Sequence, residues 1–186
     1  MNSKHSAEER IDPLLSENYL NSYMHLQRYW YAQKNCNGTI LDLGCGFGYG
    51  TKILSLTASG AIGVDISREA LDYARKHYHG PSFIRADAHH LPFKNEIFDC
   101  VVAFEVIEHV KNGKALLENI YSILKKNGLL LISTPNCAHF INFLKHHLFR
   151  EPYPYKNPNN PYHKHEYTSV SYTHLRAHET SLHLVC

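Results

Sequence analysis

The sequence predicts an α/β fold built on a Rossmann-like, doubly wound parallel sheet. Three observations lead to this prediction: apolar strand segments alternate with helical segments, a glycine-rich turn follows the first strand, and acidic residues follow later strands. Strands are expected at 40–43, 61–65, 82–86, 98–104 and 129–134. The carboxyl ends of parallel strands meet at one edge of a sheet. A ligand site is therefore expected at that edge.

Helical segments are predicted between and around these strands. They are expected at about 16–35, 49–56, 66–79, 113–125 and 137–149. Gly80-Pro81 and Asn127-Gly128 end the third and fourth of them, since neither pair continues a helix readily. The segment that follows residue 149 is rich in proline and tyrosine. We expect it to form an irregular lid or an acceptor-binding flap near the strand ends.

The glycine-rich turn has the sequence Gly44-Cys45-Gly46-Phe47-Gly48 and follows the strand that contains Asp42. Glycines let a backbone turn sharply and approach a ligand closely. The Gly-x-Gly-x-x-Gly pattern of dinucleotide-binding proteins would place a glycine where Tyr49 stands, and no Gly-Lys-Ser/Thr follows, which excludes a P-loop. The turn therefore predicts a nucleotide-sized cradle of another kind.

Together with Ile40 and Leu41, this turn resembles motif I of the class I methyltransferases that depend on S-adenosylmethionine (SAM). Residues 98–110, with Phe-Asp-x-Val-Val followed by Glu-x-x-Glu-His, resemble motif IV of the same superfamily, and residues 124–136 resemble the segment after it. The resemblance implies the class I fold, here without its final two-strand hairpin. It also implies SAM as the cofactor and methyl transfer to an oxygen, or less readily a nitrogen or carbon, of a small molecule, quinone-like lipid or saccharide.

The resemblance also implies which residues hold the cofactor. Asp65 lies 23 residues after Asp42, near the spacing of roughly 20 at which an acidic side chain reaches ribose hydroxyls. Asp87 corresponds to the acid that accepts a hydrogen bond from the adenine, and the Arg28 guanidinium could meet the methionine carboxylate. The predicted cofactor-binding residues are Asp42, Gly44, Cys45, Gly46, Gly48, Asp65, Ile66, Asp87, Ala88, Phe104 and Arg28. The alternatives are a helix cap for Asp65, a turn residue for Asp87 and a solvated helix residue for Arg28.

Methyl transfer from a sulfonium is an in-line displacement that requires alignment and exclusion of water. An acceptor hydroxyl additionally needs its proton removed, for which we predict His109 and Glu105 as catalytic residues. If a helix began at Glu105, then Glu105, Glu108 and His109 would share one face. His163 lies in a segment that resembles small-RNA 2′-O-methyltransferases, which implies that these four residues bind Mg²⁺ or Mn²⁺. In the alternative without a metal, Glu105 helps to seat the cofactor, Glu108 is solvated and His109 is a packed or a base histidine.

Other functions are considered alongside this one. An RNA 2′-O-methyltransferase with a divalent metal is the alternative within the family, but the net charge of +2 and the absence of a basic block argue against a nucleic-acid partner. An NAD-binding oxidoreductase is disfavoured by Tyr49. The chain could also be an inactive, truncated fragment. The expected partner is a small-molecule acceptor, and the oligomeric state is left open.

Composition indicates a globular domain of 186 residues, 44% of them hydrophobic and 19% charged. No apolar run approaches the roughly 18 residues that span a bilayer, and the amino terminus does not resemble a signal peptide. The five cysteines are scattered and odd in number. We therefore expect reduced thiols and a cytoplasmic location.

The domain division expected from the sequence has three parts. Residues 1–39 form an N-terminal helical segment, residues 40–168 an incomplete SAM-binding domain, and residues 169–186 an artefactual tail. Residues 170–180 of that tail resemble the translation of a transposon adapter used in sequencing libraries. Without a natural continuation, 129–132 would form an uncovered apolar sheet edge, so poor solubility is expected.

Overall fold

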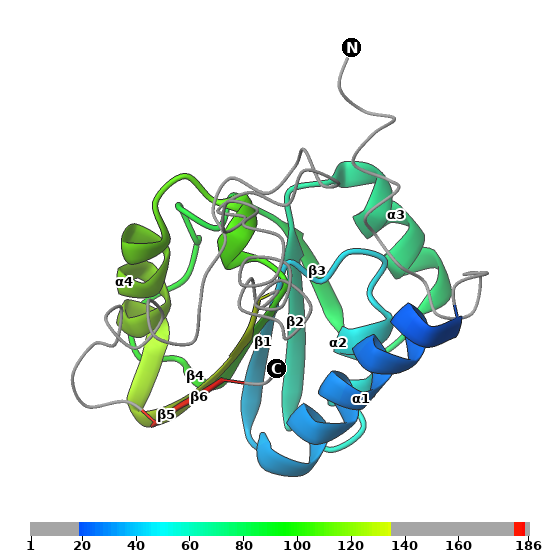
Figure 1. The fold of residues 1–186 in the computed structure, drawn as a ribbon, viewed down its shortest axis with the longest axis horizontal. Helices are drawn as coiled ribbons and strands as arrows, with labels where there is room; N and C mark the ends of the chain where they lie inside the picture. Colours follow the sequence, from blue (N-terminus) through cyan, green and yellow to red (C-terminus); the bar gives the residue numbers. More distant parts are fainter. Residues whose placement is uncertain (1–18, 135–180, 185–186) are drawn as a thin grey trace, which may run out of the picture.

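The computed structural model describes residues 19–134 and 181–184, which form one parallel sheet flanked by helices (Figure 1). The strands are β1 (Thr39–Leu43), β2 (Gly60–Asp65), β3 (Ser82–Arg85), β4 (Phe98–Phe104), β5 (Leu124–Ser133) and β6 (Ser181–Leu184). The helices are α1 (Tyr19–Asn35), α2 (Tyr49–Leu54), α3 (Arg68–His77), α4 (Gly113–Ile123) and the short 3-10 helix η2 (Ile107–His109).

The strand order is β3-β2-β1-β4-β5-β6, and every pair is parallel. From β1 the chain first adds strands on one side and then returns to the other side, where β4 pairs with β1. This reversal is a topological switch point, beside which α/β proteins bind ligands at the carboxyl ends of their strands. The predicted doubly wound parallel sheet is confirmed.

Successive side chains of a strand point to opposite faces of the sheet. Both faces of β1 and β4 are buried. One face of β1 and β4 packs against α4, and the other packs against α1 and α2, so the sheet lies between two helical layers (Figure 1). The α4 side contains Leu41, Leu43, Val101, Ala103, Leu116, Leu117, Ile120 and Ile123. The opposite side contains Tyr29, Ala32, Ile40, Leu54, Val102 and Leu131.

Capping side chains fix where two of the helices begin. The Ser67 hydroxyl accepts a hydrogen bond from the Ala70 N–H at the start of α3, and Asn112 Oδ1 accepts one from the Ala115 N–H at the start of α4. Such caps satisfy N–H groups that have no partner within the helix.

The helix expected over 113–125 and the strand expected from 129 both differ from the structure. α4 ends at Ile123, and β5 already begins at Leu124, opposite Phe98. A register irregularity between Phe98 and Cys100 accommodates the extra residues. Lys125 Nζ lies 2.8 Å from Asp99 Oδ1. Strand pairing therefore overrides local helix propensity at this position.

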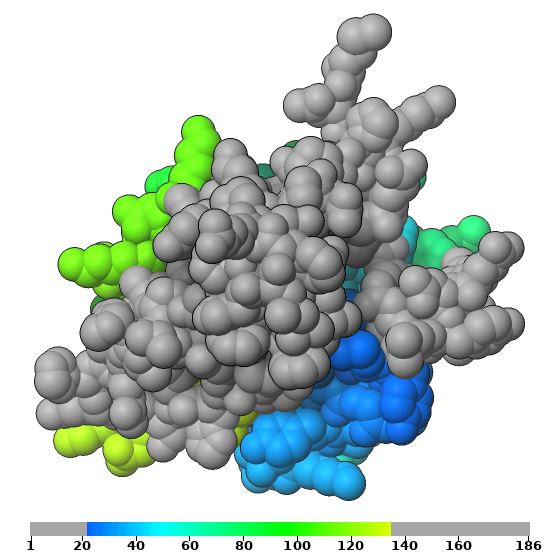
Figure 2. Space-filling view, in the orientation of Figure 1, coloured from blue at the N-terminus to red at the C-terminus, as the bar shows by residue number. Residues whose placement is uncertain are grey.

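The outer face of α1 carries exposed apolar side chains. Tyr23, Met24, Trp30 and Tyr31 are all exposed. In the space-filling view, α1 forms the blue surface at the lower right (Figure 2). The inner face of the same helix places Tyr29 and Ala32 in the core.

The sheet edge expected to be uncovered is paired in the structure. β6 runs parallel to β5, with Leu129 opposite Ser181 and Ile132 opposite Leu184. The expectation of a bare edge at 129–132 is therefore wrong. The domain boundaries and the artefactual origin of residues 169–186 stay predictions, and the helix and flap expected over 137–168 lie outside the described residues.

The cysteines also differ from expectation. Cys36, after the end of α1, forms a disulfide with Cys100 of β4, with the two Cα atoms 5.8 Å apart, whereas reduced thiols were expected. Cys45 is free and buried. Among the described residues, no helix is long and apolar enough to cross a membrane.

We predict that Phe98→Ala destabilises the fold strongly. Phe98 is completely buried, and its ring packs edge-on against Phe93 with centroids 4.9 Å apart. Removing a buried phenyl ring costs about 3–5 kcal/mol of unfolding free energy, measurable by urea denaturation. Leu56→Ala is the control, because Leu56 is 66% exposed, and should change stability by no more than about 0.5 kcal/mol. Equal effects of the two substitutions would contradict this account of the core.

Candidate functional site

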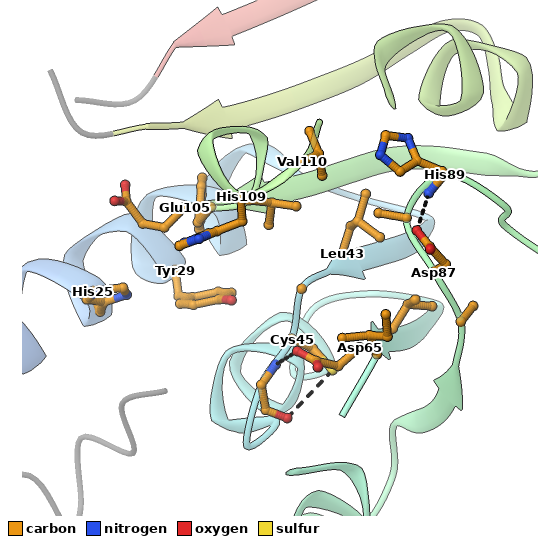
Figure 3. Close-up of a pocket in the computed structure, with 18 of the residues that line it drawn as sticks. His25, Tyr29, Leu43, Cys45, Asp65, Asp87, His89, Glu105, His109 and Val110 are labelled. Atoms are coloured by element: carbon orange, nitrogen blue, oxygen red, sulfur yellow. Dashed lines mark hydrogen bonds between the residues drawn. The ribbon is translucent and has the colours of Figure 1, made fainter. Parts of the chain in front are cut away.

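A cavity of about 630 Å³ lies at the carboxyl ends of β1, β2 and β4, next to the switch point. Its wall combines the glycine-rich turn, the segments after β2, β3 and β4, and one face of α1 (Figure 3). Most of the predicted cofactor-binding residues line it: Gly44, Cys45, Gly46, Asp65, Ile66, Asp87, Ala88 and Phe104. Asp42, Gly48 and Arg28 are not part of this lining.

The glycine-rich turn presents bare backbone to the cavity. Gly44, Gly46 and Gly48 all have positive φ angles, of 74°, 52° and 86°. A Cβ atom on Gly44 would lie 2.5 Å from Cγ2 of Val106, across the cavity wall. The turn therefore requires glycine for both its backbone conformation and its close approach to the loop after β4.

Asp65 ends β2 and ties the glycine-rich turn to that strand. Its Oδ2 accepts a hydrogen bond from the Gly46 N–H at 2.9 Å, and its Oδ1 accepts one from the Ser67 N–H at 2.8 Å. Its side chain lines the cavity. The N-cap of α3 is Ser67, so Asp65 is not itself the predicted helix cap.

Asp87 lies at the other side of the cavity from α1, beside His89 (Figure 3). Its Oδ1 accepts a hydrogen bond from the His89 N–H at 2.9 Å, which is a turn contact. Asp87 is exposed, and a carboxylate has further acceptor positions. Asp87 therefore stabilises a turn through His89 and also lines the cavity.

Comparison with known proteins agrees with this geometry. A sequence profile described as a methyltransferase domain matches residues 41–132, which include the glycine-rich turn, Asp65, Asp87 and the Glu-x-x-Glu-His segment. Residues 41–132 form a class I SAM-dependent methyltransferase domain. The cofactor of this family is SAM.

Two relatives are similar to the chain in sequence, and one solved structure is similar to it in fold. The chain is 29% identical over 123 residues to a probable SAM-dependent methyltransferase, Rv3030, of Mycobacterium tuberculosis, covering 61% of this chain and 45% of that protein. It is 36% identical over 115 residues to a ubiquinone biosynthesis O-methyltransferase of Bradyrhizobium diazoefficiens, covering 55% and 42%. The YcgJ protein of Bacillus subtilis shares the fold, with a TM-score of 0.66 at 20% identity, covering 81% and 66%. The chain spans less than half the length of either of these two relatives.

The end of the methyltransferase cavity nearest α1 gathers ionisable side chains. His25, Glu105 and His109 lie there, opposite Asp87 (Figure 3). Glu105 Oε1 accepts a hydrogen bond from the Ser133 hydroxyl at 2.8 Å and lies 3.4 Å from Arg28 Nη1. Arg28, predicted to bind the methionine carboxylate, is thus paired with Glu105. Burial and the Arg28 charge lower the pKa of His25.

The predicted metal site is not assembled by the described residues. Glu105 has a φ of 55° and precedes η2 rather than starting a helix, so the expectation that Glu105, Glu108 and His109 share one helix face is wrong. Glu108 is completely buried and is not part of the cavity lining. No group of three or more His, Cys, Asp or Glu side chains suited to a metal occurs within 19–134 or 181–184. His163 lies outside these ranges, so its predicted role is untested.

Asp42 is also placed differently from the prediction. Its side chain is fully buried beneath the turn and accepts hydrogen bonds from the hydroxyls of Tyr29 and Thr51. Tyr29, Thr51 and His25 are not among the predicted site residues. A signal existed for two of them, because His25 and Tyr29 are four residues apart and share one face of α1.

We predict that Glu108→Gln changes how stability depends on pH. Both Glu108 oxygens are buried without a well-formed hydrogen bond in the described chain. Burial, reinforced by the Glu105 charge, outweighs the nearby Thr134 hydroxyl and raises the pKa of Glu108 from 4.5 to about 9. The folded state therefore keeps a proton that the unfolded state loses above pH 4.5. The contribution of Glu108 to the free energy of unfolding is fully present below pH 4.5. It falls as the pH rises towards 9, by at most about 1.4 kcal/mol per pH unit.

Glutamine cannot ionise, so the stability of the variant relative to the unsubstituted chain should increase progressively between pH 5 and 9. Thermal unfolding across that range measures the difference. Glu118→Gln, at an exposed position beside Lys114, is the control and should show no such trend. Parallel stability curves for the unsubstituted chain and Glu108→Gln would contradict the buried, protonated state.

Proposed function

We propose that this protein transfers a methyl group from SAM to an oxygen of a small molecule, with a quinone-like lipid or a saccharide as the favoured acceptor classes. The observation that carries the proposal is the single cavity that holds Asp65 and Asp87 on one side and Glu105 and His109 on the other. The relative from Bradyrhizobium is named as an O-methyltransferase, which supports oxygen as the accepting atom. The acceptor is the expected partner. A cytoplasmic location stays a prediction, and the Cys36–Cys100 disulfide removes the argument from reduced thiols on which it was based.

The residues present fit the cofactor. Asp65 lies at a strand end where an acid can bind ribose hydroxyls, and Asp87 with Ala88 lies where the adenine would be recognised. Gly44 and Gly46 line the same cavity, where their backbone could approach the amino-acid part of the molecule closely. SAM supplies an activated methyl group on a sulfonium, so the protein chiefly has to align donor and acceptor and exclude water.

The end of the cavity nearest α1 contains side chains that could remove the proton from a substrate hydroxyl. His109 and Glu105 both line this end, and an imidazole is a suitable base near neutral pH. Glu105 is held by Ser133 and Arg28, which fixes its orientation. We therefore assign His109 the role of general base and Glu105 the role of orienting the acceptor hydroxyl.

Asp65→Asn should weaken binding of S-adenosylhomocysteine by about 10- to 100-fold. The substitution removes a charge-assisted acceptor, and such hydrogen bonds contribute about 1.5–3 kcal/mol. Isothermal titration calorimetry on the full chain measures the affinity. Asp72→Asn, at an exposed position of α3, is the matched control and should bind normally. Undiminished binding by Asp65→Asn, or binding of NADH in place of S-adenosylhomocysteine, would contradict the proposal.

His109→Asn should lower the rate of methyl transfer by about 10²- to 10⁴-fold, because a general base contributes about that factor. The rate is followed as S-adenosylhomocysteine released with catechol and glycoside acceptors. Affinity for S-adenosylhomocysteine itself should be unchanged. His77→Asn, on the exposed part of α3, is the control. Turnover by His109→Asn at the unsubstituted rate would exclude His109 as the base.

A further inference from the structure

Asp42 is a charged residue type buried inside β1, and it does not line the cavity. It lies two residues before the glycine-rich turn, and its carboxylate has no exposed surface. Two helices donate to it: Tyr29 Oη of α1 lies 3.1 Å from Oδ1, and Thr51 Oγ1 of α2 lies 2.6 Å from Oδ2. Each carboxylate oxygen therefore accepts from a different helix. Burying a carboxylate is costly unless it is hydrogen-bonded in this way.

Tyr29 connects this buried carboxylate to the cavity. Its side chain lines the cavity while its hydroxyl reaches Asp42. The ring fills the space that Gly50 leaves by lacking a side chain, since a Cβ atom there would overlap the ring of Tyr29. It also packs edge-on against Tyr49 and Phe104, with centroids 5.3 and 5.2 Å apart. The ring is thus held by residues on both sides of the switch point.

The pKa of the Asp42 carboxyl depends on its two hydrogen-bond donors. Burial raises the pKa of Asp42 to about 7, the hydrogen bonds from Thr51 and Tyr29 act in the opposite direction, and the Asp65 charge raises it further. The Cys45 thiol also faces this group. Burial raises the pKa of the Tyr29 phenol well above its usual range, so it donates as a neutral hydroxyl. Loss of either donor would favour the protonated carboxyl of Asp42.

We propose that Tyr29, Asp42 and Thr51 form a positioning network through which α1 sets the shape of the glycine-rich turn for the donor. Tyr29 and Thr51 are positioning residues that act on the turn through Asp42, whose two oxygens accept from protein hydroxyls and which does not line the cavity. This inference rests on the proposed function, because it assigns the cavity to a SAM-type ligand. It differs from the prediction that Asp42 itself binds the cofactor.

Tyr29→Phe tests the network because it keeps the ring and removes only the hydroxyl. We expect about 3- to 10-fold weaker binding of S-adenosylhomocysteine at pH 7.5. The midpoint of the pH dependence of binding should move to higher pH, with binding stronger above the midpoint, where Asp42 is ionised. Thr51→Val should act in the same direction, and the double variant should be less than additive because both donors serve one carboxylate. Asp42→Asn should abolish the pH dependence near 7.

Tyr31→Phe is the matched control, since Tyr31 lies on the exposed side of the same helix. It should leave both affinity and pH profile unchanged. A merely structural hydroxyl would lower the melting temperature of Tyr29→Phe without moving the pH midpoint. That result would overturn the proposal.

Hydrogen exchange of the ligand-free chain gives a second readout. Tyr29→Phe should speed exchange of the amides of residues 44–51, although these lie 15 or more positions away in sequence, and Tyr31→Phe should not. Unchanged exchange there would refute the network without reference to any ligand. If the unsubstituted chain binds no S-adenosylhomocysteine, the proposed function fails, and the exchange result still decides the network.

Discussion

The pairing of β1 with β4 is the contact on which the rest of the site depends. Ile40, Leu41 and Asp42 lie opposite Cys100, Val101 and Val102, although the two strands are separated by about 60 residues. This register brings the turn after β1 beside the loop after β4. Gly44 can then approach Val106, and Glu105 faces the same cavity as Asp65. The buried apolar residues on both faces of these strands stabilise that register.

Much of this arrangement could be predicted from the sequence, because it follows from local pattern and strand ends. The glycine-rich turn, Asp65 and Asp87 each follow an apolar strand, and parallel strands bring their carboxyl ends together. Motif spacing therefore identified one whole side of the cavity. The five predicted strands also occur, with β5 starting five residues early because Leu124 pairs with Phe98.

The orientation of the other site residues depends on tertiary contacts, which the local sequence pattern does not contain. Glu105 has a positive φ and precedes a short 3-10 helix, and Glu108 is buried outside the cavity that Glu105 and His109 line. Whether Asp42 faces the cavity or the interior depends on hydroxyl donors from two other elements, one of them 13 residues earlier. The Cys36–Cys100 disulfide and the pairing of β6 join segments far apart in sequence, and neither has a local signature.

The two buried carboxyl groups illustrate different solutions to burial. Asp42 receives a hydrogen bond at each oxygen, whereas Glu108 has no well-formed one among the described residues and keeps its proton. Among its other contacts, α1 is joined to β1 by the Tyr29 hydroxyl and to β4 by the disulfide that follows its last turn. While the disulfide is intact, the carboxyl end of α1 cannot separate from the sheet. A ligand that enters beside α1 therefore does so with the carboxyl end of this helix fixed to β4.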